Sequence, residues 1–254
     1  MRRTGALIFE PGRSRYTAMD TQLVTAIAVK PPLEFDLIAD FACPWSFLGK
    51  RKLERALDNL YAASAPSLRW HGLRTKRDVP AASSAWRDHL ATRLPAGVSV
   101  DLAQETLSQA GRELGINFDF EHLPDVPDTR EAHRLVKLAE GDGLEGALVD
   151  ALFSAFFERG LDIGDHKVLA ELARERGIKD ATLAAFNDPA PGGAQVDAEE
   201  KRLHGLGVTG TPNLLINGRI LVPGPADVST YVQALDQALF PSLTVSEDEK
   251  RLLH

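Results

Sequence analysis

The chain has a single cysteine among its 254 residues, Cys43, and this scarcity excludes several classes of protein. One cysteine cannot form an intramolecular disulfide, so a small fold held together by disulfides is excluded. It supplies no thiolate cluster for zinc, and the seven histidines show no H-x-x-x-H spacing. We therefore expect no metal site and no tightly bound cofactor, and a reducing compartment, the cytoplasm.

Long apolar runs and an excess of basic residues are also missing. No run approaches the roughly 18 apolar residues of a membrane-spanning helix. The piece Ala6–Phe9 is too short for the core of a signal peptide. Lys and Arg number 29 against 36 Asp and Glu, a net charge of -7. The lack of a long apolar run leads us to expect no membrane partner. Because phosphate binding needs a basic surface, we also expect no nucleic-acid partner.

The amino-terminal part of the chain predicts a strand, a helix and a second strand. Leu33–Asp40 has the β-branched and aromatic residues of a buried strand. Pro44 favours the first turn of a helix that runs to about Tyr61, because proline has no N–H to leave unpaired there. Ser67–Leu73 predicts the second strand.

From about residue 84 to residue 206 the pattern is helical. It predicts helices within 99–115, 128–141, 146–160 and 165–177, and a loop over 187–195. The cluster Phe153, Phe156 and Phe157 predicts core. The apolar stripe of the first of these helices consists of Leu102, Leu107, Ala110 and Leu114.

Strand character returns at 213–224. Two short apolar runs flank Asn217–Gly218, a pair that tolerates positive φ and is typical of a hairpin. A last helix is predicted over 226–239. The two strand-containing parts can share one mixed sheet.

Cys43 is placed where a strand ends and a helix begins. Its sulfur can face free backbone N–H groups and the positive end of the helix dipole, which favour a thiolate. Ser46, three residues on, can donate a hydrogen bond to it. We therefore expect a thiol pKa below the ordinary value of about 8.5. The alternative is that a lone cysteine is a small core residue.

The segments D-x-x-C-P-W-x-x-x-G-K-R-x-L-E at 40–54 and G-V-x-G-x-P at 207–212, separated by a helical block, resemble the DsbA-like thioredoxin-fold proteins. The FrnE-type oxidoreductases are the most similar branch, with 2-hydroxychromene-2-carboxylate isomerases and kappa-class glutathione transferases as cousins. The resemblance implies an α/β fold, a thioredoxin-like mixed sheet with an inserted all-helical subdomain. Residues 34–83 and 207–240 would form the thioredoxin-like domain and 84–206 the insertion, with 1–33 a mobile extension and 241–254 a tail.

The resemblance also implies roles for individual residues. Cys43 matches the nucleophilic cysteine, and Pro212 matches a cis-proline that faces the thiol. From the residues alone, a trans proline at an edge strand is the commoner form. Thr211 matches the residue whose backbone pairs with a bound thiol peptide or glutathione. Pro44 and Trp45 are expected to border the same groove.

The chain departs from the family at Ser46, where FrnE-type members carry a second cysteine. A serine cannot release a mixed disulfide, so Cys43 would act as a monothiol and glutathione would be a candidate co-substrate. Two alternatives remain: a glutathione-dependent isomerase or transferase acting on a small hydrophobic electrophile, and a non-catalytic binding module.

The sequence allows two roles for several other residues. Arg74, Lys76 and Arg77 could attract an acidic thiol or form a solvated loop. His133 could lie near the thiol groove or be a structural histidine. Apart from a thiol or disulfide substrate, a homodimer is a candidate assembly.

Overall fold

The computed structural model describes residues 33–60, 68–75 and 85–240. The mobile extension and the tail predicted at the two ends of the chain fall on residues outside these ranges, apart from Leu33.

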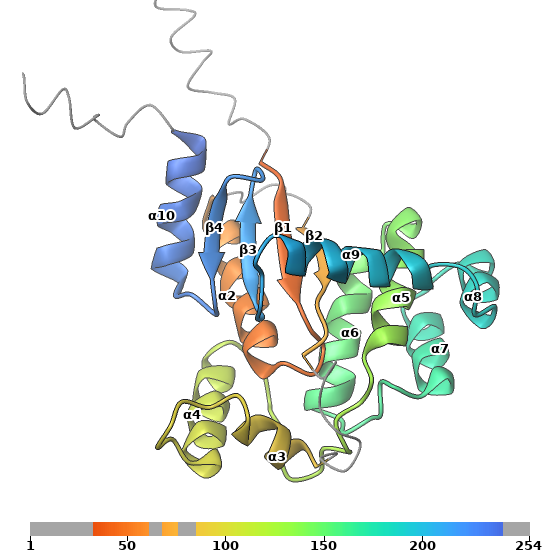
Figure 1. The fold of residues 1–254 in the computed structure, drawn as a ribbon, viewed down its shortest axis with the longest axis horizontal. Helices are drawn as coiled ribbons and strands as arrows, with labels where there is room; N and C mark the ends of the chain where they lie inside the picture. The colour runs from red at the N-terminus through yellow and green to blue at the C-terminus, as the bar shows by residue number, and fades with distance from the viewer. Residues whose placement is uncertain (1–32, 61–67, 76–84, 241–254) are drawn as a thin grey trace, which may run out of the picture. The chain divides into compact units, whose positions relative to one another are not determined.

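A four-stranded mixed sheet forms the centre of the described part, in the order β2-β1-β3-β4 (Figure 1). β1 (Phe35–Ala39) pairs in parallel with β2 (Leu68–Gly72) and antiparallel with β3 (Asn213–Ile216), and β3 pairs antiparallel with β4 (Ile220–Pro223). All five residues of β1 are buried, as a central strand requires. The predicted α/β mixed sheet is therefore confirmed.

The hairpin between β3 and β4 turns at Asn217 and Gly218, whose φ angles are 52° and 62°. Both residue types tolerate this left-handed conformation, which a tight turn between twisted strands requires. The side chain of Asn217 also accepts a hydrogen bond from the Glu34 amide at 2.9 Å, which ties the turn to the start of β1. The hairpin prediction is confirmed.

Alternate residues of β1 face opposite layers of helices. Phe35 packs in a cluster with Leu53 of α2 (Pro44–Leu60) and Leu235 of α10 (Val228–Leu239). Ile38 packs instead with Leu203 of α9 (Gly193–Gly205), which crosses the other face of the sheet in Figure 1.

The remaining helices follow β2 and precede β3 in the chain. The core of this part is α6, whose Phe153, Phe156 and Phe157 are fully buried, as predicted. These helices are α3 (Trp86–Ala91), α4 (Val100–Glu113), α5 (Arg130–Ala139), the short 3-10 helix η1 (Glu140–Asp142), α6 (Glu145–Phe157), α7 (His166–Glu175), α8 (Asp180–Asn187) and α9.

Two helical predictions were wrong in detail. The loop predicted over 187–195 ends earlier, because α9 already begins at Gly193. On α4 the buried face is Ala103, Leu107 and Gly111, whereas Leu102 is 56% exposed. Gly111 lies on this face because Phe118 packs so closely that an added Cβ would lie 2.7 Å from its ring.

None of the helices in the described ranges has the combination of length and apolar character that crossing a membrane requires.

Candidate functional site

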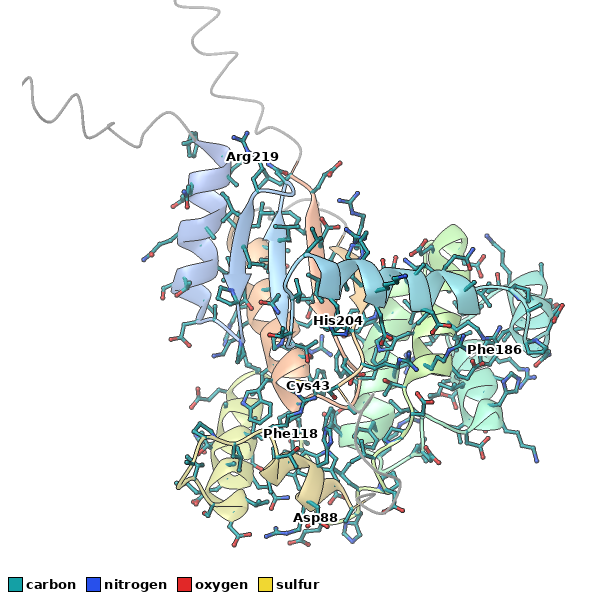
Figure 2. All side chains as sticks on the ribbon, viewed as in Figure 1. Cys43, Asp88, Phe118, Phe186, His204 and Arg219 are labelled. Carbon is teal, nitrogen blue, oxygen red and sulfur yellow. The ribbon has the colours of Figure 1, made fainter. Side chains whose placement is uncertain are left out.

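Cys43 lies at the junction of β1 and α2, where the chain turns sharply into the helix. The Cys43 amide donates to the Asp40 carbonyl at 3.2 Å, and the Ser46 amide donates to the Cys43 carbonyl at 3.0 Å. Pro44 is the first helical residue, as predicted. Figure 2 shows Cys43 at this end of α2, toward α3 and α4.

The thiol of Cys43 faces the segment that leads into β3. Its S–H donates to the carbonyl oxygen of Thr211, with 3.6 Å between sulfur and oxygen. The Thr211–Pro212 peptide bond is cis. The Pro212 ring lies against Gly49 of α2, where an added Cβ would come within 3.0 Å of the proline Cγ. Two segments 168 residues apart thus meet at the sulfur.

A cavity of about 380 Å³ opens in front of Cys43. The first turn of α2, the segment before Pro212 and the α3 region all contribute to it. Among the predicted site residues, Pro44, Trp45 and Thr211 line this cavity together with Cys43. The remaining lining residues are Ala42, Thr75, Trp86, His89, Leu90, Arg93, Pro95, Gly210 and Pro225.

Two predicted site residues lie beside this cavity without lining it. Ser46 is fully buried, and its hydroxyl accepts a hydrogen bond from the Asp40 amide at 3.4 Å. Pro212 lines a neighbouring groove, which shares Gly210 and Thr211 with the cavity of Cys43. Ser46 therefore stabilises the turn between β1 and α2 on which Cys43 lies.

The expectation of an acidic thiol at Cys43 was wrong. Burial raises the pKa of the Cys43 thiol above its ordinary value, because the residue is only 5% exposed and a thiolate there loses its hydration. Hydrogen bonds from Ser46 and Thr211 act in the opposite direction, and the negative charge of Asp40 raises the pKa further. The desolvation of the sulfur, which depends on the folded structure around it, is the largest of these effects.

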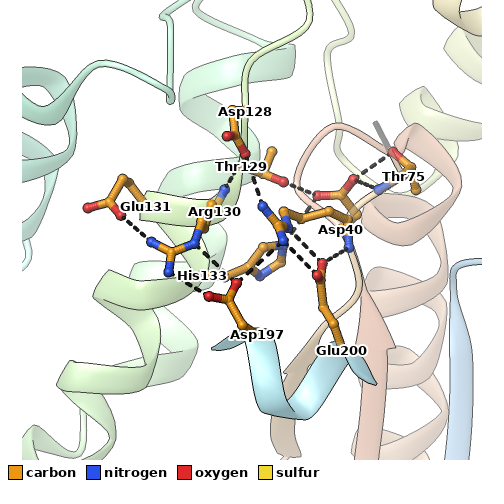
Figure 3. Close-up of polar contacts among 10 residues, drawn as sticks. Asp40, Thr75, Asp128, Thr129, Arg130, Glu131, His133, Asp197 and Glu200 are labelled. Atoms are coloured by element: carbon orange, nitrogen blue, oxygen red, sulfur yellow. Dashed lines mark hydrogen bonds and ion pairs between the residues drawn. The ribbon is translucent and has the colours of Figure 1, made fainter. Parts of the chain in front are cut away.

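A buried polar network surrounds the carboxylate of Asp40, directly upstream of the turn that carries Cys43 (Figure 3). Thr129 donates its hydroxyl to this carboxylate at 2.7 Å, and Thr75 donates both its amide and its hydroxyl, at 2.7 and 2.6 Å. His133 lies 3.2 Å away through Nε2. These contacts fix the end of β1, from which the turn to Cys43 starts.

The contact of Trp70 decides which nitrogen of His133 carries its proton. The indole Nε1 of Trp70 lies 3.1 Å from His133 Nδ1. An indole N–H can only donate, so Nδ1 accepts, and the ring proton is on Nε2, which donates to Asp40. Gly72 makes this packing possible, since an added Cβ would lie 2.5 Å from Nδ1. His133 is therefore a structural histidine that positions Asp40, one of the two alternatives above.

The ionised state of Asp40 follows from these contacts. Burial alone would raise the pKa of the carboxyl, but the hydrogen bonds from His133, Thr75 and Thr129 hold it well below its usual range. Asp40 therefore keeps its negative charge, three residues before Cys43.

In the described part of the basic segment after β2, Arg74 is not a free cation for the thiol. Arg74 forms a bidentate ion pair with the buried Glu200, at 2.7 Å from both Nε and Nη2. Lys76 and Arg77 lie outside the described residues. A charge that the sequence analysis missed, Arg93, lines the cavity instead. The spacing of Trp86, Leu90 and Arg93 on one helical face could have indicated it.

Within the described ranges, no group of three or more His, Cys, Asp or Glu side chains is arranged to hold a metal ion.

The sequence profile of the DSBA-like thioredoxin domain matches residues 35–236, most of the chain. The chain therefore belongs to the DsbA-like thioredoxin family, as the resemblance implied. None of the curated proteins matches the chain.

Solved structures show the same fold. A probable DsbA oxidoreductase from Streptomyces coelicolor superposes with a TM-score of 0.70 at 26% identity, over 84% of this chain and 92% of that one. A 2-hydroxychromene-2-carboxylate isomerase gives a TM-score of 0.62 at 15% identity, over 82% and 96%. The cytosolic disulfide reductase DsbM from Pseudomonas aeruginosa gives 0.54 at 21%, over 86% and 99%.

Proposed function

We propose that this DsbA-like protein is a monothiol thiol–disulfide oxidoreductase, in which Cys43 attacks a disulfide and an external thiol resolves the adduct. One observation carries the proposal: the Cys43 sulfur lies 3.6 Å from the Thr211 carbonyl, at the wall of a cavity that can admit a ligand. A disulfide that enters there meets the sulfur and the adjoining backbone together.

The first step exchanges one disulfide for another. The thiolate of Cys43 attacks one sulfur of the substrate R–S–S–R, forming the mixed disulfide Cys43–S–S–R and releasing R–S⁻ as the leaving thiolate. The attacking form arises by loss of the thiol proton to solvent. Because burial raises the pKa of Cys43, only a small fraction of the protein carries the thiolate at neutral pH. The thiolate that does form is correspondingly more nucleophilic.

The second step needs a thiol from outside the chain. Cys43 is the only cysteine, and the position three residues on is Ser46, so no internal thiol can attack the adduct. An external thiolate R′–S⁻ attacks the R sulfur, gives R–S–S–R′ and restores the Cys43 thiolate. The Ser46 hydroxyl stabilises this thiolate by a hydrogen bond that lowers the Cys43 pKa.

Glutathione is our candidate for the external thiol. The Pseudomonas disulfide reductase that shares this fold has a structure with glutathione. Glutathione is also the abundant thiol of reducing compartments, which suit a chain whose single cysteine has no disulfide partner. We therefore propose the cytoplasm as the site of action.

A glutathione-dependent isomerase or transferase is the second candidate. The observation that favours it is the lining of the cavity by Trp45, Trp86 and Leu90, which suits a small hydrophobic electrophile. In that case glutathione would bind beside Cys43 and its own sulfur would react.

Intact-protein mass spectrometry after incubation with oxidised glutathione separates these functions. The monothiol oxidoreductase gains one glutathione on Cys43, which reduced glutathione then removes; Cys43→Ser gains none. Glutathione that binds in a calorimeter without forming an adduct supports the isomerase or transferase. If neither adduct nor binding is found, the chain is a non-catalytic module and the proposal fails.

A further inference from the structure

Among the described residues that line the cavity in front of Cys43, Arg93 is the one permanently charged side chain. The other described lining residues are apolar or uncharged, apart from the titratable His89. Arg93 follows α3 and is exposed. It donates a hydrogen bond to the Thr75 carbonyl, so its guanidinium reaches across the cavity toward the segment after β2.

The Arg93 guanidinium has no carboxylate partner among the described residues. Neighbouring arginines do have such partners. Arg87, on the same helix, pairs with Asp101 at 2.7 Å, and Arg74 pairs with Glu200 at 2.7 Å. An arginine has five N–H donors, and the contact with Thr75 occupies one of its nitrogens. In a chain with a net charge of -7, an arginine at a cavity that pairs with no carboxylate in the described part of the chain is a local site for an anion.

The indole nitrogen of Trp86, which belongs to a lining residue, also lacks a hydrogen-bond partner within the described part of the chain. Trp86 is only 4% exposed, and a buried N–H without an acceptor is costly. The Trp86 indole is therefore a buried donor beside the cavity that the described part of the chain leaves unsatisfied.

We propose that Arg93 recognises a carboxylate on the substrate, so that Cys43 acts on small disulfides or thiols that carry a carboxylate. This inference rests on the proposed function and adds a substrate class to it. The volume of about 380 Å³ is that of a small-molecule site. A carboxylate is favoured over a phosphate, because one guanidinium balances a single charge and a dianion would leave charge uncompensated beside apolar walls.

The test compares two disulfides of the same shape and different charge. Dithiodipropionate carries a carboxylate at each end, and its diamide carries none. The rate at which each forms an adduct on Cys43 is measured by mass spectrometry for the native and the urea-unfolded protein. The unfolded protein gives the intrinsic preference of the thiol. We expect the native fold to shift this preference toward dithiodipropionate by about five- to tenfold, as one charged hydrogen bond at a partly exposed site provides.

Arg93→Gln should remove this shift, so that the ratio of the two rates in the folded variant equals the ratio in the unfolded protein. Arg87→Gln is the matched control, since Arg87 lies on α3 without lining the cavity, and it should keep the shift. If Arg93→Gln slows both disulfides equally, or if the native protein shows no shift, Arg93 does not recognise a carboxylate and the inference is overturned.

A second measurement separates this inference from the proposed function. In the Cys43→Ser background no covalent step occurs, and binding of dithiodipropionate is followed by calorimetry with and without Arg93→Gln. Binding that needs Arg93 while the wild-type protein forms no adduct would retain the carboxylate site and refute the redox function. An adduct on Cys43 without any binding that depends on Arg93 would retain the redox function and refute the carboxylate site.

Discussion

The Cys43 sulfur lies 3.6 Å from the backbone carbonyl of Thr211 and donates its S–H to it. This contact joins the first turn of α2 to the segment before β3 and places the thiol at the wall of a cavity. Burial around this contact raises the pKa of the thiol, so Cys43 is held in its protonated form at neutral pH.

The first prediction concerns the acidity of Cys43. The alkylation rate should rise with pH to a midpoint above about 8.5, because burial raises the thiol pKa in the folded protein. In urea the midpoint should return to about 8.5. The free energy of unfolding should fall as the pH rises from the unfolded toward the folded pKa, since the folded state binds the proton more tightly. A midpoint below 8.5 in the folded protein would contradict the burial argument.

The hydroxyl of Ser46 should lower the pKa of the Cys43 thiol by a measurable amount. Ser46→Ala removes a hydrogen bond that lowers the Cys43 pKa, so the alkylation midpoint should move to still higher pH. Since Cys43 is the only cysteine, all labelling reports on this residue. An unchanged midpoint would show that the hydroxyl does not contact the thiolate.

Ser46→Cys should convert the monothiol site into a dithiol site. Positions 43 and 46 border the first helical turn, where residues three apart have Cα atoms about 5 Å apart, within the range of a disulfide. In an oxidising glutathione buffer this variant should lose two hydrogens by mass, and it should reduce disulfides faster than wild type with a dithiol reductant. Ser46→Ala is the control. A variant that accumulates only the glutathione adduct would show that the turn lacks the required geometry.

Asp40→Asn should destabilise the fold at neutral pH by about 1–3 kcal/mol, because a buried acceptor of several hydrogen bonds is replaced in part by a donor. The carboxyl pKa is depressed, so its contribution is present above the unfolded value of about 3.9 and is lost as the pH falls through the folded one. Wild type and variant should therefore converge in stability on acidification, as measured by urea unfolding.

Asp40→Asn should also change the pKa of the Cys43 thiol. The charge of Asp40 raises the pKa of Cys43, so Asp40→Asn should lower the alkylation midpoint. Asp101→Asn changes an exposed carboxylate and should alter stability by no more than about 0.5 kcal/mol, with no effect on the thiol. Equal effects of the two substitutions would contradict the role assigned to Asp40.

Gly49→Ala should perturb the site through the Pro212 ring. The added Cβ would lie 3.0 Å from the proline Cγ, so the two segments that meet at Cys43 must move apart, at a cost of about 1–3 kcal/mol. Gly146→Ala, in α6 with no atom within 4 Å of the added Cβ, should instead stabilise by up to about 1 kcal/mol. Denaturant unfolding of both variants, with the adduct rate on Cys43, checks the contrast.

Much of the fold could be predicted from local pattern and resemblance. The strand before Cys43, the helix that begins at Pro44 and the hairpin at Asn217–Gly218 each carry a signal within a few residues. The order of the strands and helices indicated that they can share one mixed sheet, and the family resemblance added the thioredoxin-like arrangement. The meeting of Cys43 with Thr211 could be expected only from this resemblance, because nothing local links residues 168 apart.

The predictions that were wrong or missing concern properties that depend on burial in the folded protein. The pKa of Cys43 is set by the protein around the sulfur, which a pattern of neighbours along the chain does not reveal. Leu102 matches a helical stripe as well as Leu107 does, but a face of Ala103 and Gly111 admits Phe118 more closely. Arg93 lines the site because α3 packs near Cys43, which depends on the three-dimensional fold.

The most direct test of the central claim is the steady-state reduction of hydroxyethyl disulfide by reduced glutathione, coupled to glutathione reductase. We predict that the wild-type protein accelerates this reaction with a rate that rises with pH toward the Cys43 midpoint, and that Cys43→Ser has no activity above the uncatalysed rate. A Cys43→Ser variant that keeps the wild-type rate would contradict the assignment of Cys43 as the nucleophile.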